Sequence, residues 1–154
     1  MKEFYIETAV IEDAPQIAKL EEKRLVCPWS LAVIQKEIRE NHLAQYLVLK
    51  VDSGEKKEII GSVGYWKIGV EWSINNVVVS EEWEGQGLGT KLMEALISKA
   101  KQEGALQLML EVGQSNKGAQ RLYEKVGFFV NGRREDYYSG EGEAALLMCC
   151  LLGE

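Results

Sequence analysis

Three closely spaced glycines form the sequence's main candidate for a ligand-binding turn. Gly85, Gly87 and Gly89 lie between an apolar run rich in valine and a segment whose leucines have helical spacing. Glycines leave backbone N–H groups uncovered, and the N-terminus of a helix adds partial positive charge. Such a turn is suited to an anion, above all a pyrophosphate. The same glycines are also compatible with a tight strand-to-helix turn that binds nothing.

Two common phosphate-binding loops do not fit this turn. A Walker loop needs Gly-Lys-Ser/Thr after its glycines, whereas here Thr90 precedes Lys91. The dinucleotide fingerprint needs Gly-x-Gly-x-x-Gly, whereas these glycines are spaced Gly85-x-Gly87-x-Gly89. Both loops are therefore excluded.

The turn resembles the pyrophosphate loop of the GNAT acetyltransferases, Arg/Gln-x-x-Gly-x-Gly/Ala after the fourth strand. Gly87 and Gly89 match that pattern, whereas Glu84 stands where the family usually has Arg or Gln. The segment from Leu110 to Phe128 resembles the family's other signature, Leu-Glu-Val-x-x-Ser-Asn-x-x-Ala-x-x-Leu-Tyr-x-x-x-Gly-Phe. With the order of elements, the resemblance covers nearly the whole chain.

The resemblance implies that acetyl-coenzyme A is the cosubstrate and that its acetyl group moves directly to an amine in a ternary complex. The implied coenzyme contacts come from a strand, the turn and the start of a later helix: Val77, Val78, Val79, Gly85, Gln86, Gly87, Leu88, Gly89, Thr90 and Asn116. A backbone N–H near Val79 would donate to the oxyanion.

Acetyl transfer needs a free amine, a donor to the oxyanion and an acid for the departing thiolate. The resemblance assigns Glu111 as the base, directly or through water, and Tyr123 as the acid. Tyr123 follows Asn116 by two helical turns, so both residues point along one side of a helix. Two alternatives remain open: Glu111 as an exposed charged residue on a strand, and Tyr123 as a core tyrosine beside Leu122.

Further features resemble one branch of the family, the bacterial ribosomal-protein-alanine N-acetyltransferases. They are the Pro28-Trp29-Ser30 loop and the tail from Arg133 through Ala144, although Gly113 replaces the arginine that is frequent after Glu-Val. The implied acceptor is the N-terminal α-amine of a protein, and a ribosomal protein is the candidate that this branch suggests. An α-amine has a reference pKa of ~7.7–8, against ~10.4 for lysine, so a carboxylate base suffices at neutral pH.

The acceptor is expected between aromatic walls at Trp29, Tyr137 and Tyr138. These aromatic side chains are also compatible with simply closing the core. Two other functions remain open. One is acetylation of a small amine such as a polyamine or an aminoglycoside, and the other is a non-catalytic acyl-coenzyme A-binding module.

A covalent cysteine mechanism is disfavoured by the surroundings of the cysteines. Cys149 and Cys150 lie in an apolar run, and Cys27 lies near the expected acceptor loop. The single histidine, His42, is expected to cap the end of a solvated helix. No His/Cys/Asp cluster has metal-ligand spacing, so no metal is expected.

Composition is typical of one globular domain spanning residues 1–154, with 46% apolar and 27% charged residues. The formal net charge of −6 is opposite to that of proteins that neutralise many phosphates, so we expect no direct contact with nucleic acid. No signal peptide or apolar run of ~18 residues is visible, and an odd cysteine count suits a reduced compartment. We expect a cytoplasmic protein that binds no membrane and is a monomer or a homodimer.

Apolar periodicity predicts the elements that must position these residues. Strands are expected at Phe4–Ala9, Gln45–Val51, Glu58–Ile68, Trp72–Val79, Ala105–Val112, Phe128–Arg134 and Ala144–Leu151. Helices are expected after Asp13, after a Ser30 cap with Leu31, Ile34 and Ile38 on one face, from Leu88 to about Glu103, and from a Ser115-Asn116 cap to Gly127. The order βααβββαβαββ predicts an α/β (α+β) GNAT fold with a mixed, mostly antiparallel sheet of six to seven strands and helices on both faces.

Overall fold

The computed structural model describes residues 3–25, 27–138 and 143–153, without the side chains of 136–138. Its strands are β1 Glu3–Thr8, β2 Ala44–Asp52, β3 Lys57–Ile68, β4 Glu71–Val79, β5 Gln107–Gly113, β6 Phe129–Tyr138 and β7 Glu143–Leu151. Its α-helices are α1 Ala14–Arg24, α2 Leu31–Glu40, α3 Leu88–Gln102 and α4 Lys117–Lys125. Short 3-10 turns, η1 Ile11–Asp13 and η2 Glu81–Trp83, precede α1 and α3. The predicted order of helices and strands is confirmed.

Two of the helices begin at the residues whose side chains were expected to cap them. Oγ of Ser30 accepts a hydrogen bond of 3.2 Å from the Val33 N–H at the start of α2. Oδ1 of Asn116 accepts one of 3.1 Å from the Ala119 N–H at the start of α4. Each oxygen satisfies a backbone donor that has no partner within the helix. The predicted Ser30 cap is therefore confirmed, and Asn116 is the capping residue of the predicted Ser115-Asn116 pair.

The sheet has seven strands in the order β1-β2-β3-β4-β5-β7-β6. Neighbours among the first four strands are all antiparallel. β4 and β5 are parallel, and β7 lies between β5 and β6, antiparallel to both. This placement of β7 brings β6 and β5 onto opposite sides of one strand, so side chains of β6 and β5 can meet across β7.

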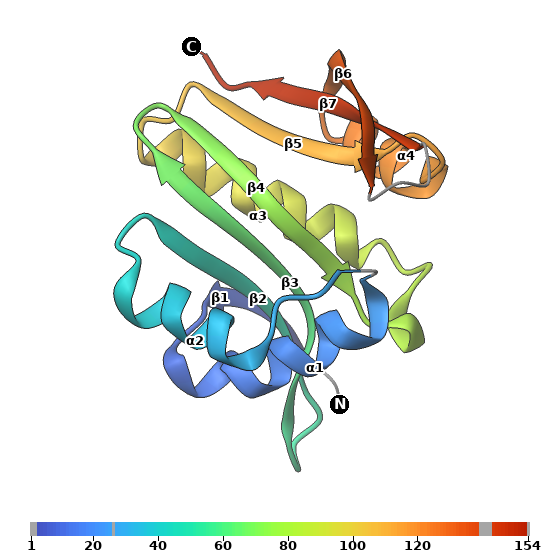
Figure 1. Cartoon of the computed structure of the whole chain (residues 1–154). Coiled ribbons are helices and arrows are strands. Elements are labelled where there is room, and N and C mark those ends of the chain that lie inside the picture. The colour runs from blue at the N-terminus through green and yellow to red at the C-terminus, as the bar shows by residue number, and fades with distance from the viewer. Residues whose placement is uncertain (1–2, 26, 139–142, 154) are drawn as a thin grey trace.

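Helices cover both faces of the sheet, as Figure 1 shows: α1 and α2 lie on one face, and α3 lies on the other. Under α3, the predicted apolar stripe is buried, with Leu92, Leu96 and Ala100 all 0% exposed. A second core, which includes Ile17 and Ile34, lies between α1, α2 and the sheet. Burial of these apolar faces supplies the main free energy of folding.

One predicted helix face is partly wrong. Ile34 of α2 is 0% exposed, but Leu31 is 39% exposed. Leu31 is the first residue of α2, and helical side chains lean towards the helix N-terminus, so this residue projects beyond the part of the helix that packs on the sheet. Ile38 is half-buried and packs against the same core as Ile34.

Candidate active site

The strands β4 and β5 pair only at their beginnings. Their register runs over three residues, from Glu71 opposite Gln107 to Ser73 opposite Met109. Figure 1 shows the two strands diverging towards their C-terminal ends. The edge of β4 beyond Ser73 therefore offers backbone groups to a ligand on the side that faces β5.

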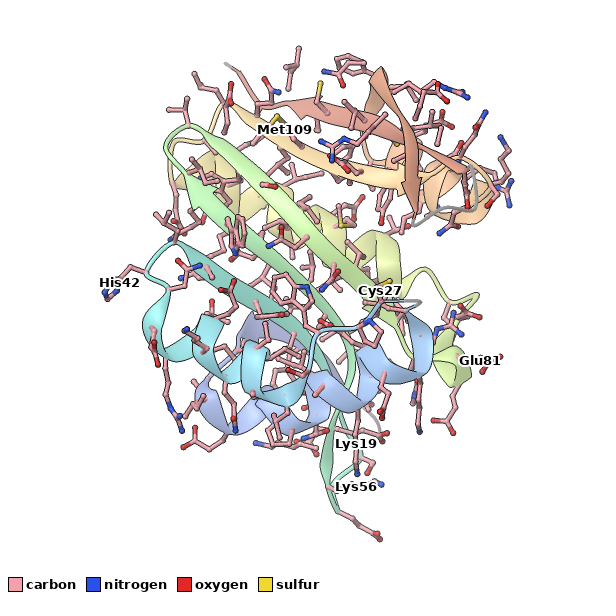
Figure 2. All side chains as sticks on the ribbon, viewed as in Figure 1. Lys19, Cys27, His42, Lys56, Glu81 and Met109 are labelled. Atoms are coloured by element: carbon pink, nitrogen blue, oxygen red, sulfur yellow. The ribbon has the colours of Figure 1, made fainter. Side chains whose placement is uncertain are left out.

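A cavity of about 990 Å³ lies at this divergence, and we call it the central cavity. Its walls come from four parts of the chain: the α1–α2 segment, β4, β5, and the β6–β7 pair with the start of α4. Figure 2 labels one lining residue from each of two walls, Cys27 from the α1–α2 segment and Met109 from β5. A cavity of this size and mixed polarity is suited to a ligand.

Glu111 lies on β5 and lines the central cavity. Its side chain is only 28% exposed, so it is not the freely solvated strand residue of the alternative interpretation. Oε2 of Glu111 lies 3.0 Å from Nη2 of Arg134, whereas Oε1 is buried and has no hydrogen-bond partner in the described part of the chain. One carboxylate oxygen is thus held by a cation while the other is available to accept a proton.

The strand order explains why Arg134 reaches Glu111. Ala145 of β7 pairs with Gly113 of β5 on one side and with Arg134 of β6 on the other. Glu111 is two residues from Gly113 and therefore shares its face of the sheet. The small side chain of Ala145 leaves room for the guanidinium to reach across β7. Sequence reasoning identified Arg134 only as part of a motif, because this pairing depends on β7 lying between β5 and β6.

Trp29 also lines the central cavity, in the segment that joins α1 to α2. Its backbone N–H donates a hydrogen bond of 3.3 Å to Oε1 of Glu21, and Nδ2 of Asn76 in β4 donates another of 3.3 Å to the same oxygen. Glu21 is 0% exposed, and burial raises the pKa of its carboxyl group. Glu21 therefore joins two walls of the cavity, a role that its charged neighbours in the sequence did not suggest.

The glycine turn has the conformation expected of an anion-binding turn. Gly87 is the N-cap of α3, with a left-handed φ of 76°, and the flanking residues 85 and 86 are exposed. A Cβ atom on Gly89 would lie 3.3 Å from Cδ2 of Leu122, so a side chain at position 89 would force Leu122 of α4 to shift slightly. Exposed amides at the start of a helix of 15 residues fit a pyrophosphate.

The predicted coenzyme residues do not all lie on the central cavity. Asn116 lines it, together with Glu111 and Trp29, whereas residues 77–79 and 85–90 do not. The side-chain oxygen of Asn116 already caps α4. The turn and the cavity are therefore separate parts of the expected site, connected along β4 and η2.

Tyr123 is 8% exposed and lies in the core under α3 rather than on the central cavity. Its ring packs against Phe128, with 5.9 Å between ring centroids. The role of Tyr123 as an acid therefore stays a prediction. Tyr137 and Tyr138 belong to β6, but their side chains lie outside the described residues, as does the predicted turn at residues 140–142.

The cysteines differ in their surroundings, as expected. Cys149 and Cys150 are buried, and burial raises the pKa of both thiols, which disfavours their thiolates. Cys27 is exposed and lines the central cavity.

Among the described residues, there is no group of three or more His, Cys, Asp or Glu side chains that could hold a metal ion. In the same part of the chain, no helix has the length and apolar character to cross a membrane.

Residues 9–128 match the acetyltransferase (GNAT) family, so the chain belongs to this family. It is an acetyl-CoA-dependent N-acetyltransferase, and its sheet of seven strands with helices on both faces is the fold of the family. The predicted fold class, enzyme class and cosubstrate are confirmed.

Relatives with named activities cover almost the whole chain. The chain is 34% identical over 150 residues to the ribosomal protein bS18-alanine N-acetyltransferase of Haemophilus ducreyi. This match covers 96% of this chain and 99% of the relative. The crystal structure of the ribosomal-protein-S18-alanine N-acetyltransferase from Escherichia coli has a TM-score of 0.87 and 26% identity, covering 99% of this chain and 96% of that one. A chain of the NatC complex bound to Gag peptide and CoA has a TM-score of 0.81 and 27% identity, and the match covers 97% of this chain and 99% of that one. The predicted resemblance to the ribosomal-protein-alanine branch is confirmed.

Proposed function

We propose that this enzyme acetylates the N-terminal α-amine of a protein, and that its physiological acceptor is the N-terminal alanine of ribosomal protein bS18. The observation that carries the proposal is the Glu111 carboxylate, which belongs to a residue lining the cavity between the Trp29 segment and β6 and whose buried Oε1 has no hydrogen-bond partner among the described residues. The similarity to bS18-alanine N-acetyltransferases over nearly the full length of both chains supports the acceptor. Such an acceptor also favours a cytoplasmic enzyme.

In the proposed mechanism, the amides of residues 85–90 and the N-terminus of α3 bind the coenzyme pyrophosphate. Acetyl-CoA supplies the acetyl group as a thioester. Oε1 of Glu111 accepts the proton that the acceptor ammonium loses, and Arg134 holds the same carboxylate through Oε2. A backbone N–H near Val79 donates to the oxyanion, and the Tyr123 hydroxyl gives its proton to the departing thiolate.

Acetylation assays with peptides and small amines test this function. We expect release of free coenzyme A thiol with a peptide that begins with the bS18 N-terminus, and acetylation of its α-amine by mass spectrometry. The value of kcat/KM should exceed that for spermidine by at least about tenfold, because only the peptide fills the cavity. A preference for spermidine would instead indicate a small-amine enzyme. Coenzyme binding without thiol release from any amine would indicate a non-catalytic module.

A further inference from the structure

Three carboxylates precede the turn that we expect to hold the pyrophosphate. Glu81 and Glu82 lie in η2, Glu84 is next to Gly85, and all three are exposed. Glu84 stands where the family usually has Arg or Gln. Like charges repel at close range, so the side chains of this segment by themselves oppose a negatively charged pyrophosphate. A cation from elsewhere in the fold would offset that repulsion.

Arg24 brings a positive charge to this segment from α1. It is the last residue of that helix, and its Nη2 donates a hydrogen bond to Oε2 of Glu84, which is 60 residues further along the chain. Its Nη1 lies 3.9 Å from Oε1 of Glu81. The Arg24 side chain is 28% exposed and lines the central cavity that also holds Glu111.

The chemistry of arginine allows it to bind two anions at once. A guanidinium has five N–H donors, and the hydrogen bond to Glu84 occupies one of them. The remaining donors can bind phosphate oxygens in the same plane. Glu84 directly precedes Gly85, so the hydrogen bond attaches the guanidinium to the residue next to the glycine turn.

We propose that Arg24 is the cationic side chain of the coenzyme pyrophosphate site and that Glu84 holds it there. Arginine from α1 thus replaces the arginine or glutamine that the family usually has at position 84. Arg24 donates hydrogen bonds to the pyrophosphate from one side, while the amides at the start of α3 donate from the other. This inference rests on the proposed placement of the coenzyme at residues 85–90.

Titration of the full-length protein with coenzyme A tests this role. We expect Arg24→Ala to raise the Kd by about tenfold, which is typical of losing a hydrogen bond to a charged group. The matched control is Lys23→Ala, which removes an equal charge from the neighbouring exposed position of α1. Its Kd should stay within about twofold of that of the wild-type protein, since exposed charges interact weakly in water. An unchanged Kd in Arg24→Ala, or an effect confined to the KM of the peptide, overturns the proposal.

Double variants separate direct contact from mere neutralisation of Glu84. If Arg24 contacts the pyrophosphate, the double variant Arg24→Ala, Glu84→Gln should still bind coenzyme A weakly, because no cation is present. Arg24→Ala combined with Glu84→Arg recovers affinity, because the cation returns at the position that is usual in the family. Full recovery with Glu84→Gln would mean that Arg24 only neutralises Glu84, which overturns the proposal.

Shortened coenzymes identify the phosphate that Arg24 contacts. Arg24→Ala should also raise the Kd of 3′-dephospho-coenzyme A, which keeps the pyrophosphate. It should leave the KM of S-acetylpantetheine unchanged, because that substrate lacks the pyrophosphate. An effect that vanishes with 3′-dephospho-coenzyme A would place Arg24 on the 3′-phosphate and overturn the proposal. Failure of the wild-type protein to bind coenzyme A would refute the coenzyme placement itself and is distinguishable, because no variant is needed to observe it.

Discussion

Arg134 and Glu111 form an ion pair across β7, with 3.0 Å between Nη2 of Arg134 and Oε2 of Glu111. The pair fixes one oxygen of the carboxylate and leaves Oε1 buried, without a hydrogen-bond partner in the described residues. A buried carboxylate oxygen without a donor is energetically costly, and such atoms are common at functional sites. The pair therefore fixes the carboxylate of a residue that lines the central cavity.

Removing the basicity of Glu111 should slow acetylation in a manner that depends on pH. We expect Glu111→Gln to lower kcat/KM by roughly 100-fold at neutral pH, a typical effect of losing a general base. The deficit should shrink as pH rises through the α-amine pKa of ~7.7–8, because the acceptor then loses its proton without help. The measurement is a pH–rate profile of both proteins. A deficit that is the same at all pH values would give Glu111 a structural role.

Removing Arg134 should affect catalysis more than coenzyme binding. In Arg134→Ala the Glu111 carboxylate loses its partner and becomes free to rotate, so we expect kcat to fall by about tenfold. The Kd of coenzyme A should stay unchanged. The neighbouring Arg133→Ala is the matched control, because Arg133 pairs with exposed Glu135 and not with Glu111. Equal losses in both variants would contradict an orienting role for Arg134.

A side chain at Gly87 should distort the coenzyme turn without a steric clash. The φ of Gly87 is 76°, and no atom lies within 4 Å of where its Cβ would be. Valine is strained at such a φ, so Gly87→Val should shift the turn amides and raise the Kd of coenzyme A by at least about tenfold. Gly69→Val carries a similar strain in the β3–β4 turn, at a φ of 61°, and should leave the Kd unchanged. Calorimetric titration of both variants checks this.

Local patterns predicted most of the fold because they act over a few residues. The leucine spacing of α3 predicted its buried face, Ser30 predicted the start of α2 to the residue, and the Ser115-Asn116 pair predicted the start of α4 to within one residue. The glycine turn was likewise found by its spacing alone. Each of these signals has its cause and its effect within one or two turns of chain.

Contacts between residues that are far apart in the sequence were not predicted. No local pattern indicated that β7 lies between β5 and β6, so the pairing of Arg134 with Glu111 could not be predicted. Burial of Glu21 depends on how α1 packs on β4, and no local pattern indicated it. The contact of Arg24 with Glu84 likewise joins α1 to a segment 60 residues away.

Tyr123 offers a direct test of the predicted acid. Tyr123→Phe keeps the ring that packs against Phe128 and removes only the hydroxyl. If the hydroxyl protonates the departing thiolate, kcat should fall by roughly 100-fold while the Kd of coenzyme A changes little. Thiol release at saturating substrates measures kcat, and thermal unfolding checks that the core is intact. Full activity would leave Tyr123 as a core tyrosine.

Glu21 should make the stability of the protein depend on pH. Burial raises the pKa of its carboxyl group above the usual value, so the folded protein holds this proton more tightly than the unfolded chain does. Between the two pKa values the folded state binds more protons, and the free energy of unfolding therefore falls as pH rises. The contribution of Glu21 is complete below its unfolded pKa of ~4.3 and is lost as pH rises through the raised value.

Glu21→Gln removes this titration but keeps an oxygen that can accept from Trp29 and Asn76. The variant should therefore become more stable relative to the wild-type protein as pH rises from below ~4.3. Chemical denaturation across this pH range measures the difference, and Glu22→Gln, at an exposed position beside it, should show no trend. By contrast, Glu21→Leu leaves two donors without an acceptor and should cost about 1–3 kcal/mol for each that stays buried. A constant difference between Glu21→Gln and wild type at all pH values would mean that the pKa of Glu21 is the same in the folded and unfolded states, with the effect of burial offset by the two hydrogen bonds from Trp29 and Asn76.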